Sequence, residues 1–389
     1  MSELTEARWS ETKSALLEGL KGNRKSVMDV TLENTRKYIN ESASVGSTSA
    51  GNVATLNRVI LPVIRRVMPT VIANELVGVQ PMTGPVGQIH TLRVRYAEAG
   101  SGTTTNTAGE EALSPFKIAE AYSGDNSSTK AGSTSALEGT GGKKLSIQIL
   151  KQTVEAKSRK LSANWTFEAA QDAQSQQGID IEAEIMAALA QEITAEIDQE
   201  IIGSLYSLAG SASDTYNQSA VSGTATFVGD EHAALAILIN RAANAIAQRT
   251  RRGAGNYAVV SPTALTILQS ATTSAFARST EGTFEAPTNN KLVGTLNSAM
   301  KVYVNTYAAN DDVLVGYKGS SEADAPAFYC PYIPLMSSGV VLNPSTFEPT
   351  VSFLTRYGYV ELSNTASSLG NAADYLAKVA VTTANLSFA

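Results

Sequence analysis

The chain has 389 residues, of which 43% are hydrophobic and 17% are charged, and its formal net charge is −6. This length exceeds what one ordinary core needs, so at least two subdomains are expected. The acidic balance excludes a general electrostatic attraction to nucleic acid or anionic membranes, and no run reaches the ~18 apolar residues of a membrane-spanning helix.

The first 40 residues are predicted to be helical and amphipathic, because apolar side chains recur among charges of both signs. The pair Gly22-Asn23 predicts a break within this stretch. The segment from Ser42 to Asn52 consists almost entirely of small and polar residues, so it is interpreted as a linker. An arm joined to a body by such a linker is expected to move as a unit.

Residues 53 to 75 are strongly apolar, but Pro62 and Pro69 divide them, so one long helix is not expected. Alternating apolar residues up to Tyr96 then predict a strand. Residues 97 to 144 contain few large apolar side chains and cannot form a core of their own. Two interpretations stay open for them: disorder, or an extended hairpin that a partner orders. A returning strand is predicted from Leu145.

The clearest helical signal contains an internal boundary, where Gly178 is expected to end one helix and Asp180 to be the N-cap of the next. From Ile181 to Ile201 an isoleucine or leucine recurs at every fourth residue. This spacing predicts a helix that continues to about Leu208 and is roughly 40 Å long.

Residues 209 to 334 alternate between helical and strand patterns, which predicts an α/β unit. Asp230 is the expected N-cap of one helix, and Ser261-Pro262 is expected to open another directly after a buried strand. Short strands are predicted over residues 301–305, 312–317 and 327–334. After residue 345, β-branched and aromatic residues predict one long strand or two.

The residue types that carry most enzyme chemistry are scarce. The two histidines, His90 and His232, do not accompany a nucleophile motif. The single cysteine, Cys330, lies in an apolar strand pattern and is expected to be a buried small side chain. Carboxylate pairs such as Glu196 and Glu200 are more typical of a solvated helix face than of acid–base catalysis. We therefore predict no catalytic, cofactor-binding or metal site.

Three arginines are candidate contact residues. Arg249, Arg251 and Arg252 fall in one predicted loop, where they could bind phosphate or form salt bridges between subunits. One loop without interleaved aromatic residues does not decide between these alternatives.

Four separated stretches resemble the major capsid proteins of T-even-type myoviruses, and they occur in that family's order. The core VGVQPMTGPVG within the first stretch is highly specific. The stretches are VIANELVGVQPMTGPVGQIHTLRVRY (Val71 to Tyr96), VEAKSRKLSANWTFEAAQDAQSQQGIDIEAEI (Val154 to Ile185), GNYAVVSPTALTIL (Gly255 to Leu268), and FYCPYIPL with FEPTVSFLTRYGYV (Phe328 to Val360).

The resemblance implies an α+β fold of the Hong Kong 97 type, with an N-terminal arm, an extended loop, a peripheral domain containing a long spine helix, and an axial domain. It favours the hairpin interpretation of residues 97 to 144. It also reveals a departure, because many family members carry a long insertion domain where this chain is short. The expected boundaries are 1–52 for the arm and linker, 53–96 for the first part of the peripheral domain, 97–158 for the extended loop, 159–208 for the spine helix segment, 209–334 for the axial domain, and 335–389 for the C-terminal strands and tail of the peripheral domain.

The function that the resemblance implies is that of the major capsid protein of a tailed double-stranded DNA bacteriophage. Copies of the chain are expected to form hexamers, and some pentamers, of an icosahedral or prolate head that encloses DNA without sequence-specific binding. Assembly is expected in the cytoplasm of the bacterial host, without cofactor or membrane. Vertex, portal, scaffold and decoration proteins are the candidate partners.

Cleavage of the arm is a further expectation from the resemblance, because Ile39-Asn40-Glu41 matches the context that a prohead protease cuts in this family. The cut would follow Glu41, immediately before the linker. Two other functions stay open at this stage: an encapsulin-type shell protein with the same fold, and a carboxylate-based hydrolase.

Overall fold

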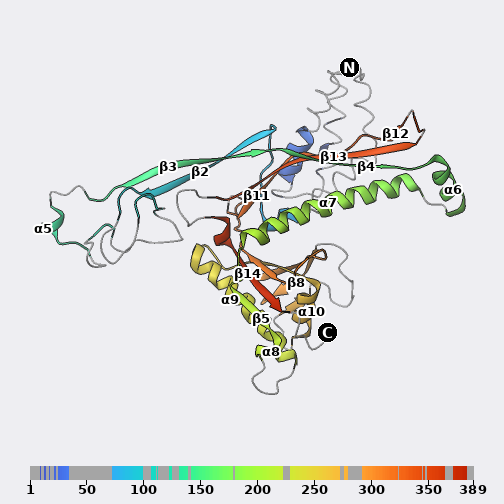
Figure 1. The fold of residues 1–389 in the computed structure, drawn as a ribbon. Helices are drawn as coiled ribbons and strands as arrows, with labels where there is room; N and C mark the ends of the chain where they lie inside the picture. The colour runs from blue at the N-terminus through green and yellow to red at the C-terminus, as the bar shows by residue number, and fades with distance from the viewer. Residues whose placement is uncertain are drawn as a thin grey trace. The chain divides into compact units, whose positions relative to one another are not determined.

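The computed structural model describes residues 9, 13–14, 17, 22, 25–34, 72–99, 107–110, 112, 122–124, 131–138, 142–177, 180–221, 228–271, 276–278, 291–322, 324–343, 345–346, 348–363 and 371–382. They belong to two compact units (Figure 1). The first unit is drawn from Met1–Gly87, Val154–Ile202 and Phe328–Val360, and the second from Gln88–Thr153, Gly203–Ala327 and Glu361–Ala389.

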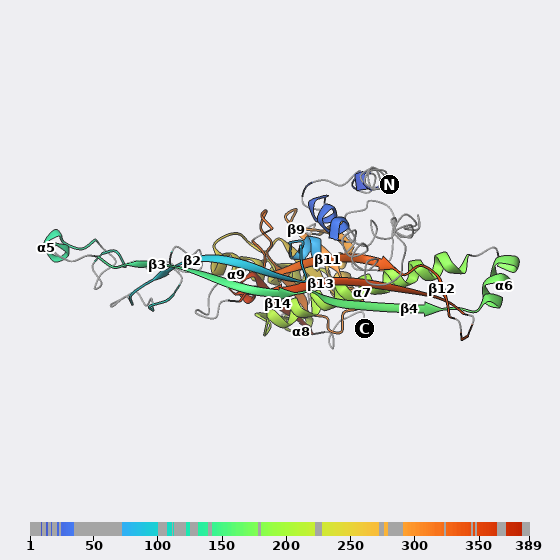
Figure 2. The same ribbon diagram turned by 90° about the horizontal axis from the view of Figure 1, so that it is seen from above.

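The sheet of the first unit has β13 (Pro349–Glu361) as an interior strand. β13 pairs antiparallel with β4 (Lys157–Asn164), and the two strands lie side by side in Figure 2. The strand order continues through β11 (Ala327–Ser337) to β1 (Gly78–Val79), while β12 (Val341–Leu342) pairs with the start of β13. Alternate residues of β13 are buried from Pro349 to Tyr357, so one face of this strand points into the core.

The predicted helix boundary at residue 180 is confirmed. A carboxylate oxygen of Asp180 accepts hydrogen bonds from the backbone N–H groups of Glu182 (3.1 Å) and Ala183 (3.4 Å), which caps α7 (Ile181–Leu208). α6 (Phe167–Gln177) precedes it, and Gly178 itself lies outside the described residues. The apolar spacing is also confirmed, because Ile193, Ile197 and Ile201 are each 1–2% exposed.

A helix over residues 25–34 packs in the first unit, so part of the predicted helical arm is confirmed. It follows Gly22, whose φ of 63° is a left-handed conformation that glycine adopts at little cost. The side-chain amide of Asn34 donates to the carbonyl oxygens of Met82 (2.6 Å) and Tyr332 (2.9 Å), which anchors the end of this helix. The predicted linker at 42–52 and the apolar residues 53–71 lie outside the described residues.

The second unit is built on a mixed seven-stranded sheet in the order β5-β14-β10-β6-β9-β8-β7. All residues of β6 and β10 are buried, as expected for interior strands of a covered sheet. The strands are β5 (Asp214–Asn217), β6 (Tyr257–Val260), β7 (Phe276–Arg278), β8 (Lys291–Leu296), β9 (Met300–Val304), β10 (Val313–Gly316) and β14 (Leu376–Thr382).

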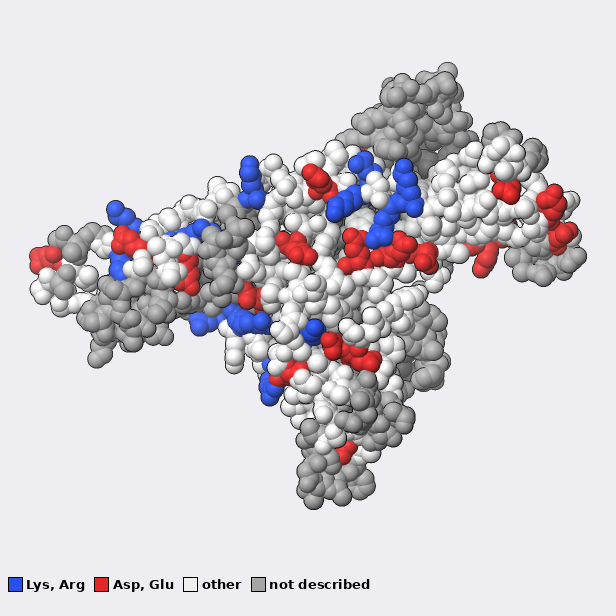
Figure 3. Space-filling model, viewed as in Figure 1, with Lys and Arg blue, Asp and Glu red and all other residues white. Residues whose placement is uncertain are grey.

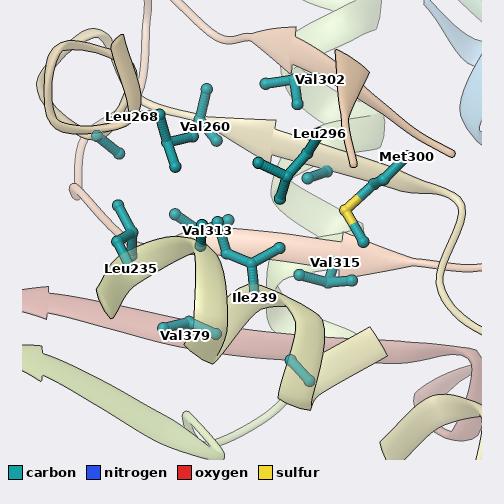
Figure 4. Packing of buried hydrophobic residues seen from close by; sticks show 14 of the residues in the cluster. Leu235, Ile239, Val260, Leu268, Leu296, Met300, Val302, Val313, Val315 and Val379 are labelled. Atoms are coloured by element: carbon teal, nitrogen blue, oxygen red, sulfur yellow. The ribbon is translucent and has the colours of Figure 1, made fainter. Parts of the chain in front are cut away.

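The core of the second unit lies between this sheet and its helices. Leu235 and Ile239 of α9 (Val228–Thr250) are fully buried among the side chains of β10, including Val313 (Figure 4). Each such side chain contributes about 1.5–3 kcal/mol when it is removed from water. α10 (Pro262–Ser270) completes the layer, and its predicted N-cap is confirmed because the Ser261 hydroxyl accepts a hydrogen bond from the Ala264 N–H (3.1 Å). α8 (Gln218–Val221) and a 3-10 turn, η2 (Ala372–Tyr375), also belong to this unit.

Residues 97 to 144 are described only in part, so the choice between disorder and a partner-ordered hairpin stays open for them, but the strands that flank them are paired. β2 (Val86–Tyr96) and β3 (Leu145–Glu155) form a two-stranded sheet and run in opposite directions (Figure 1). We call this pair the ribbon. A short helix, α5 (Thr134–Leu137), lies in the connection between the two strands. The ribbon includes the strand that is predicted to end at Tyr96. It therefore begins at residue 86, before the predicted boundary of the extended loop at residue 97.

Two expectations need correction. β14 was assigned to the peripheral segment 335–389, but it pairs with β10 and β5 and so belongs to the sheet of the second unit. The helix expected to start after Asp230 begins at Val228, which puts Asp230 in its first turn. Since an acidic residue stabilises both an N-cap and a first turn, the sequence pattern did not distinguish the two positions.

Candidate assembly surfaces

A charged cluster joins α7 to β4 and β13 in the first unit. The guanidinium of Arg159 donates from Nη1 to Glu196 (2.6 Å), from Nη2 to Glu200 (2.5 Å) and from Nε to the hydroxyl of Tyr357 (2.6 Å). That hydroxyl in turn donates to the Glu200 carboxylate. We call these four residues the Arg159 cluster. Basic side chains over β4 meet acidic side chains over α7 in Figure 3.

The electrostatics of the Arg159 cluster favour its charged form. Burial by itself would raise the pKa of Glu200, but hydrogen bonds from Arg159 and Tyr357 outweigh burial and hold that pKa below its ordinary value. The ionised residues are 30–45% exposed, so solvent screening limits each ion pair to about 0.2–1 kcal/mol. The main effect of the cluster is therefore to fix the position of α7 against the sheet.

The solvated face predicted for Glu196 and Glu200 agrees with their side-chain exposures of 45% and 41%, and both carboxylates also bind Arg159. The basic residues of β4 were visible in the sequence. Their partners on α7 were not assignable, because nothing local in the sequence says which strand packs beneath that helix.

The turn region of β12 exposes apolar side chains in the first unit. Val340, Val341 and Leu342 are 40%, 56% and 45% exposed. The end of β4 lies beside this turn, because the Trp165 N–H donates to the carbonyl oxygen of Pro349 (3.2 Å). Short edge strands with exposed apolar residues are prone to pairing and are usually covered in an assembly.

The ribbon exposes a second apolar surface. Leu145, Ile147 and Ile149 lie two residues apart on β3, so they share one face, and they are 48%, 72% and 66% exposed. We call these three the apolar row. A two-stranded ribbon is marginally stable alone in water, so a covering surface for this row would stabilise it.

Aromatic side chains reinforce the ribbon where β2 ends. The rings of Tyr96 and Tyr122 lie 4.5 Å apart, and the Tyr122 hydroxyl donates to the carbonyl oxygen of Lys144 (2.7 Å). The Ala112 N–H donates to the carbonyl oxygen of Val94 (2.6 Å), which extends hydrogen bonding along the outer edge of β2. The hairpin is therefore held by more than its two strands.

The three candidate arginines differ in their surroundings. Arg249 lies in the last turn of α9 and donates to the carbonyl oxygen of Leu376 (2.8 Å). Arg252 pairs with Asp324 (2.6 Å). Arg251 is exposed and has a left-handed φ of 51°. Arg249 and Arg252 thus have partners within the subunit, and Arg251 is the arginine most available to another molecule.

The two histidines and the cysteine were the candidates for enzyme chemistry, and each is a surface or a core side chain in the structure. His90 is exposed on β2, whereas His232 is 2% exposed with its Nδ1 2.5 Å from the Ser270 hydroxyl. Burial lowers the pKa of His232 below its ordinary value. Cys330 is 3% exposed, and burial raises the pKa of its thiol to about 11, so a reactive thiolate is not favoured at neutral pH. Glu41 lies outside the described residues.

The residues that the structure describes contain neither a metal-binding cluster nor a membrane-spanning helix. Among these residues, no group of three or more His, Cys, Asp or Glu side chains is placed to hold a metal ion. No helix in the described part of the chain has both the length and the apolar character needed to cross a membrane.

Comparison with known proteins finds similarity to the major capsid proteins and capsids of phages. The profile of a family described as "Major capsid protein Gp23" matches residues 53–381. The major capsid protein of Vibrio phage KVP40 is 30% identical over 85% of this chain and 82% of that relative. That of Enterobacteria phage T4 is 28% identical over 82% of this chain and 78% of that relative. Among solved structures, the capsid of Myoviridae phage XM1 aligns with a TM-score of 0.45 and 10% identity over 80% of this chain and 92% of that one.

Proposed function

Because this chain belongs to the Gp23 family of major capsid proteins, we propose that its copies join through the ribbon into hexamers and pentamers of a phage head. The protein is a major capsid protein of a tailed bacteriophage and part of the virion, where it assembles as a multimer into the shell. The encapsulin-type and hydrolase alternatives are not favoured by this family membership. We propose that shell building is the only activity of the chain.

The apolar row is the observation that carries the proposed role of the ribbon. Three large apolar side chains on one face are exposed in the single subunit, and each contributes about 1–2 kcal/mol when a neighbour covers it. Such an interface is modest by itself. A closed lattice repeats it in every subunit, so the total stabilisation is large.

The other parts of the chain have proposed roles that follow the same plan. The arm over residues 1–52 would wrap a neighbouring subunit, and the peripheral domain, with the β13 sheet and α7, would form the wall of the shell. The second unit, apart from its ribbon, would be the axial domain that meets its copies around the capsomer axis, with Arg249, Arg251 and Arg252 as candidate contacts. Assembly would take place in the host cytoplasm around double-stranded DNA, with vertex, portal, scaffold and decoration proteins as candidate partners.

Electron microscopy of purified protein tests the role of the ribbon. The wild type is expected to form closed shells, whereas the double variant Ile147→Ser/Ile149→Ser is expected to remain as free subunits or small oligomers. Ile147→Val/Ile149→Val keeps the apolar surface and is the matched control, with shells like those of the wild type. Both side chains are exposed, so thermal unfolding of the free subunit should change little in either variant.

Two outcomes would contradict different parts of the proposal. Normal shells from the serine variant would refute docking through the apolar row while leaving the capsid role intact. A wild-type protein that stays monomeric under every assembly condition would refute self-assembly of this chain alone.

A further inference from the structure

Arg95 of β2 is a buried charge for which the described residues offer no partner. Its side chain is 8% exposed, and its Nε and Nη2 atoms are enclosed without a hydrogen-bond acceptor. The Ala97 N–H donates to the carbonyl oxygen of Lys144 (3.0 Å), so Ala97 lies opposite Lys144 in the ribbon. Arg95 shares the face of Ala97, and the aromatic pair at Tyr96 lies on the other face.

An arginine in this position is unfavourable in the isolated subunit. The guanidinium stays protonated under all physiological conditions, so it cannot avoid the cost of burial by becoming neutral as a lysine or histidine does. Removing a charge from water is costly unless an opposite charge and hydrogen bonds compensate for it. A compensating group is therefore expected when the protein is in its working state.

The charge distribution indicates where that group comes from. β2 and β3 carry three basic residues, Arg93, Arg95 and Lys151, against one acidic residue, Glu155, although the whole chain has a net charge of −6. The excess of acid therefore lies outside the ribbon. The exposed apolar row lies on the other face of the ribbon, with Tyr96, and it marks the ribbon as an element that contacts protein rather than nucleic acid, whose phosphates prefer exposed cations.

We propose that a carboxylate of a second copy of this chain pairs with Arg95 when the ribbon docks on it. The inference rests on the proposed docking of the ribbon and adds a polar anchor on the face opposite the apolar row, so that neighbouring copies would cover both faces. Nη1 is the guanidinium nitrogen that is not enclosed, so an incoming carboxylate would reach Arg95 through this atom. The pairing would make docking specific in register, because a misplaced ribbon leaves the charge buried and uncompensated.

Replacing Arg95 by Met tests the pairing, because Met keeps an unbranched apolar side chain and removes the charge. Free Arg95→Met subunits are expected to unfold at the same temperature as the wild type or higher, since an uncompensated charge is lost. Their yield of closed shells is expected to fall by about tenfold or more, as for truncation of one partner of a buried charge pair. Arg95→Lys keeps the charge and is expected to restore part of that yield. Lys151→Met, at an exposed position on the same ribbon, is the matched control with near wild-type yield.

The other outcomes each overturn the inference. A marked fall in the unfolding temperature of free Arg95→Met subunits would place the partner within the same chain. Normal empty shells that fail only when DNA is packaged would assign Arg95 to phosphate instead. Normal shells of every kind would leave Arg95 without a role in docking. If Ile147→Ser/Ile149→Ser assembles normally, docking through the apolar row fails independently of Arg95.

Discussion

At the scale of single residues, the backbone of Arg251 is held in a conformation that costs energy for an arginine. Its N–H donates to the carbonyl oxygen of Ala247 (2.8 Å) at the end of α9, and its φ is 51°. Glycine is the residue that usually ends a helix in this way. An arginine here is consistent with selection for its side chain, as expected of a contact with phosphate or a neighbouring subunit.

The first prediction concerns this residue. Arg251→Gly is expected to raise the free energy of unfolding by about 0.5–1 kcal/mol, because the left-handed conformation no longer opposes a Cβ atom. Shell yield is expected to fall in the same variant, because the exposed guanidinium is lost. Urea unfolding and electron microscopy measure the two effects, with Arg251→Lys as the charge-preserving control. A destabilised Gly variant would mean that the arginine stabilises its own subunit.

The second prediction concerns pH and the Arg159 cluster. The pKa of Glu200 is lower in the folded subunit than its ordinary value of 4.5, so its contribution to stability is present above that value. This contribution is lost as the pH falls through the lower, folded pKa. Glu200→Gln is therefore expected to be less stable than the wild type at pH 7, with a flatter loss of stability as the pH falls below about 4.5.

Thermal unfolding of unassembled subunits across this pH range measures the difference. Glu192→Gln changes an exposed carboxylate on the same helix and is the control, expected to follow the wild-type curve. Parallel curves for wild type and Glu200→Gln would show that the cluster adds nothing to acid stability.

At the scale of elements, local signals in the sequence predicted the ends of helices and most strands. Asp180 and Ser261 cap the helices that follow them, since a cap depends on neighbours within three residues. The two strands of the ribbon are predicted from their patterns, whereas two interpretations stay open for residues 97–144, because that segment has no core of its own. The Arg159 cluster was not predictable, because it joins residues that are 37, 41 and 198 positions apart.

The third prediction treats the ribbon as a separable element. Because Ala97 and Lys144 are opposite each other, residues 98–143 can be replaced by the two-residue turn Asn-Gly. The shortened chain is expected to fold, with circular dichroism and a cooperative thermal transition like those of the wild type, and to form no closed shells. Normal shells from this variant would contradict a role for the hairpin in assembly, and an unfolded variant would show that the hairpin supports its own subunit.

At the scale of the whole molecule, the two units are interleaved along the chain. The sequence pattern predicts an α/β unit over residues 209–334, but β14 joins the sheet of this unit from residues 376–382. Strand patterning reports that a segment is extended and partly buried, and it carries no information about which sheet the segment joins. The boundary at residue 334 also falls inside β11, a strand that continues to Ser337.

The fourth prediction concerns the arm. If a prohead protease cuts after Glu41, intact mass measurement of protein from mature virions is expected to find a chain that begins at Ser42. Glu41→Gln should block the cut and leave the full arm in the particle. A mature virion in which all subunits retain residues 1–41 would refute processing at this site.

The late position of two interior strands has a consequence for the timing of synthesis. β13 pairs with strands on both sides in one sheet, and β14 lies between β5 and β10 in the other, yet each comes after all other described strands of its sheet along the chain. Neither sheet can close before its last strand has been synthesised and has left the ribosome. A chain that is terminated before β13 therefore lacks both finished sheets, and one terminated between β13 and β14 lacks the second, so neither is expected to enter the lattice.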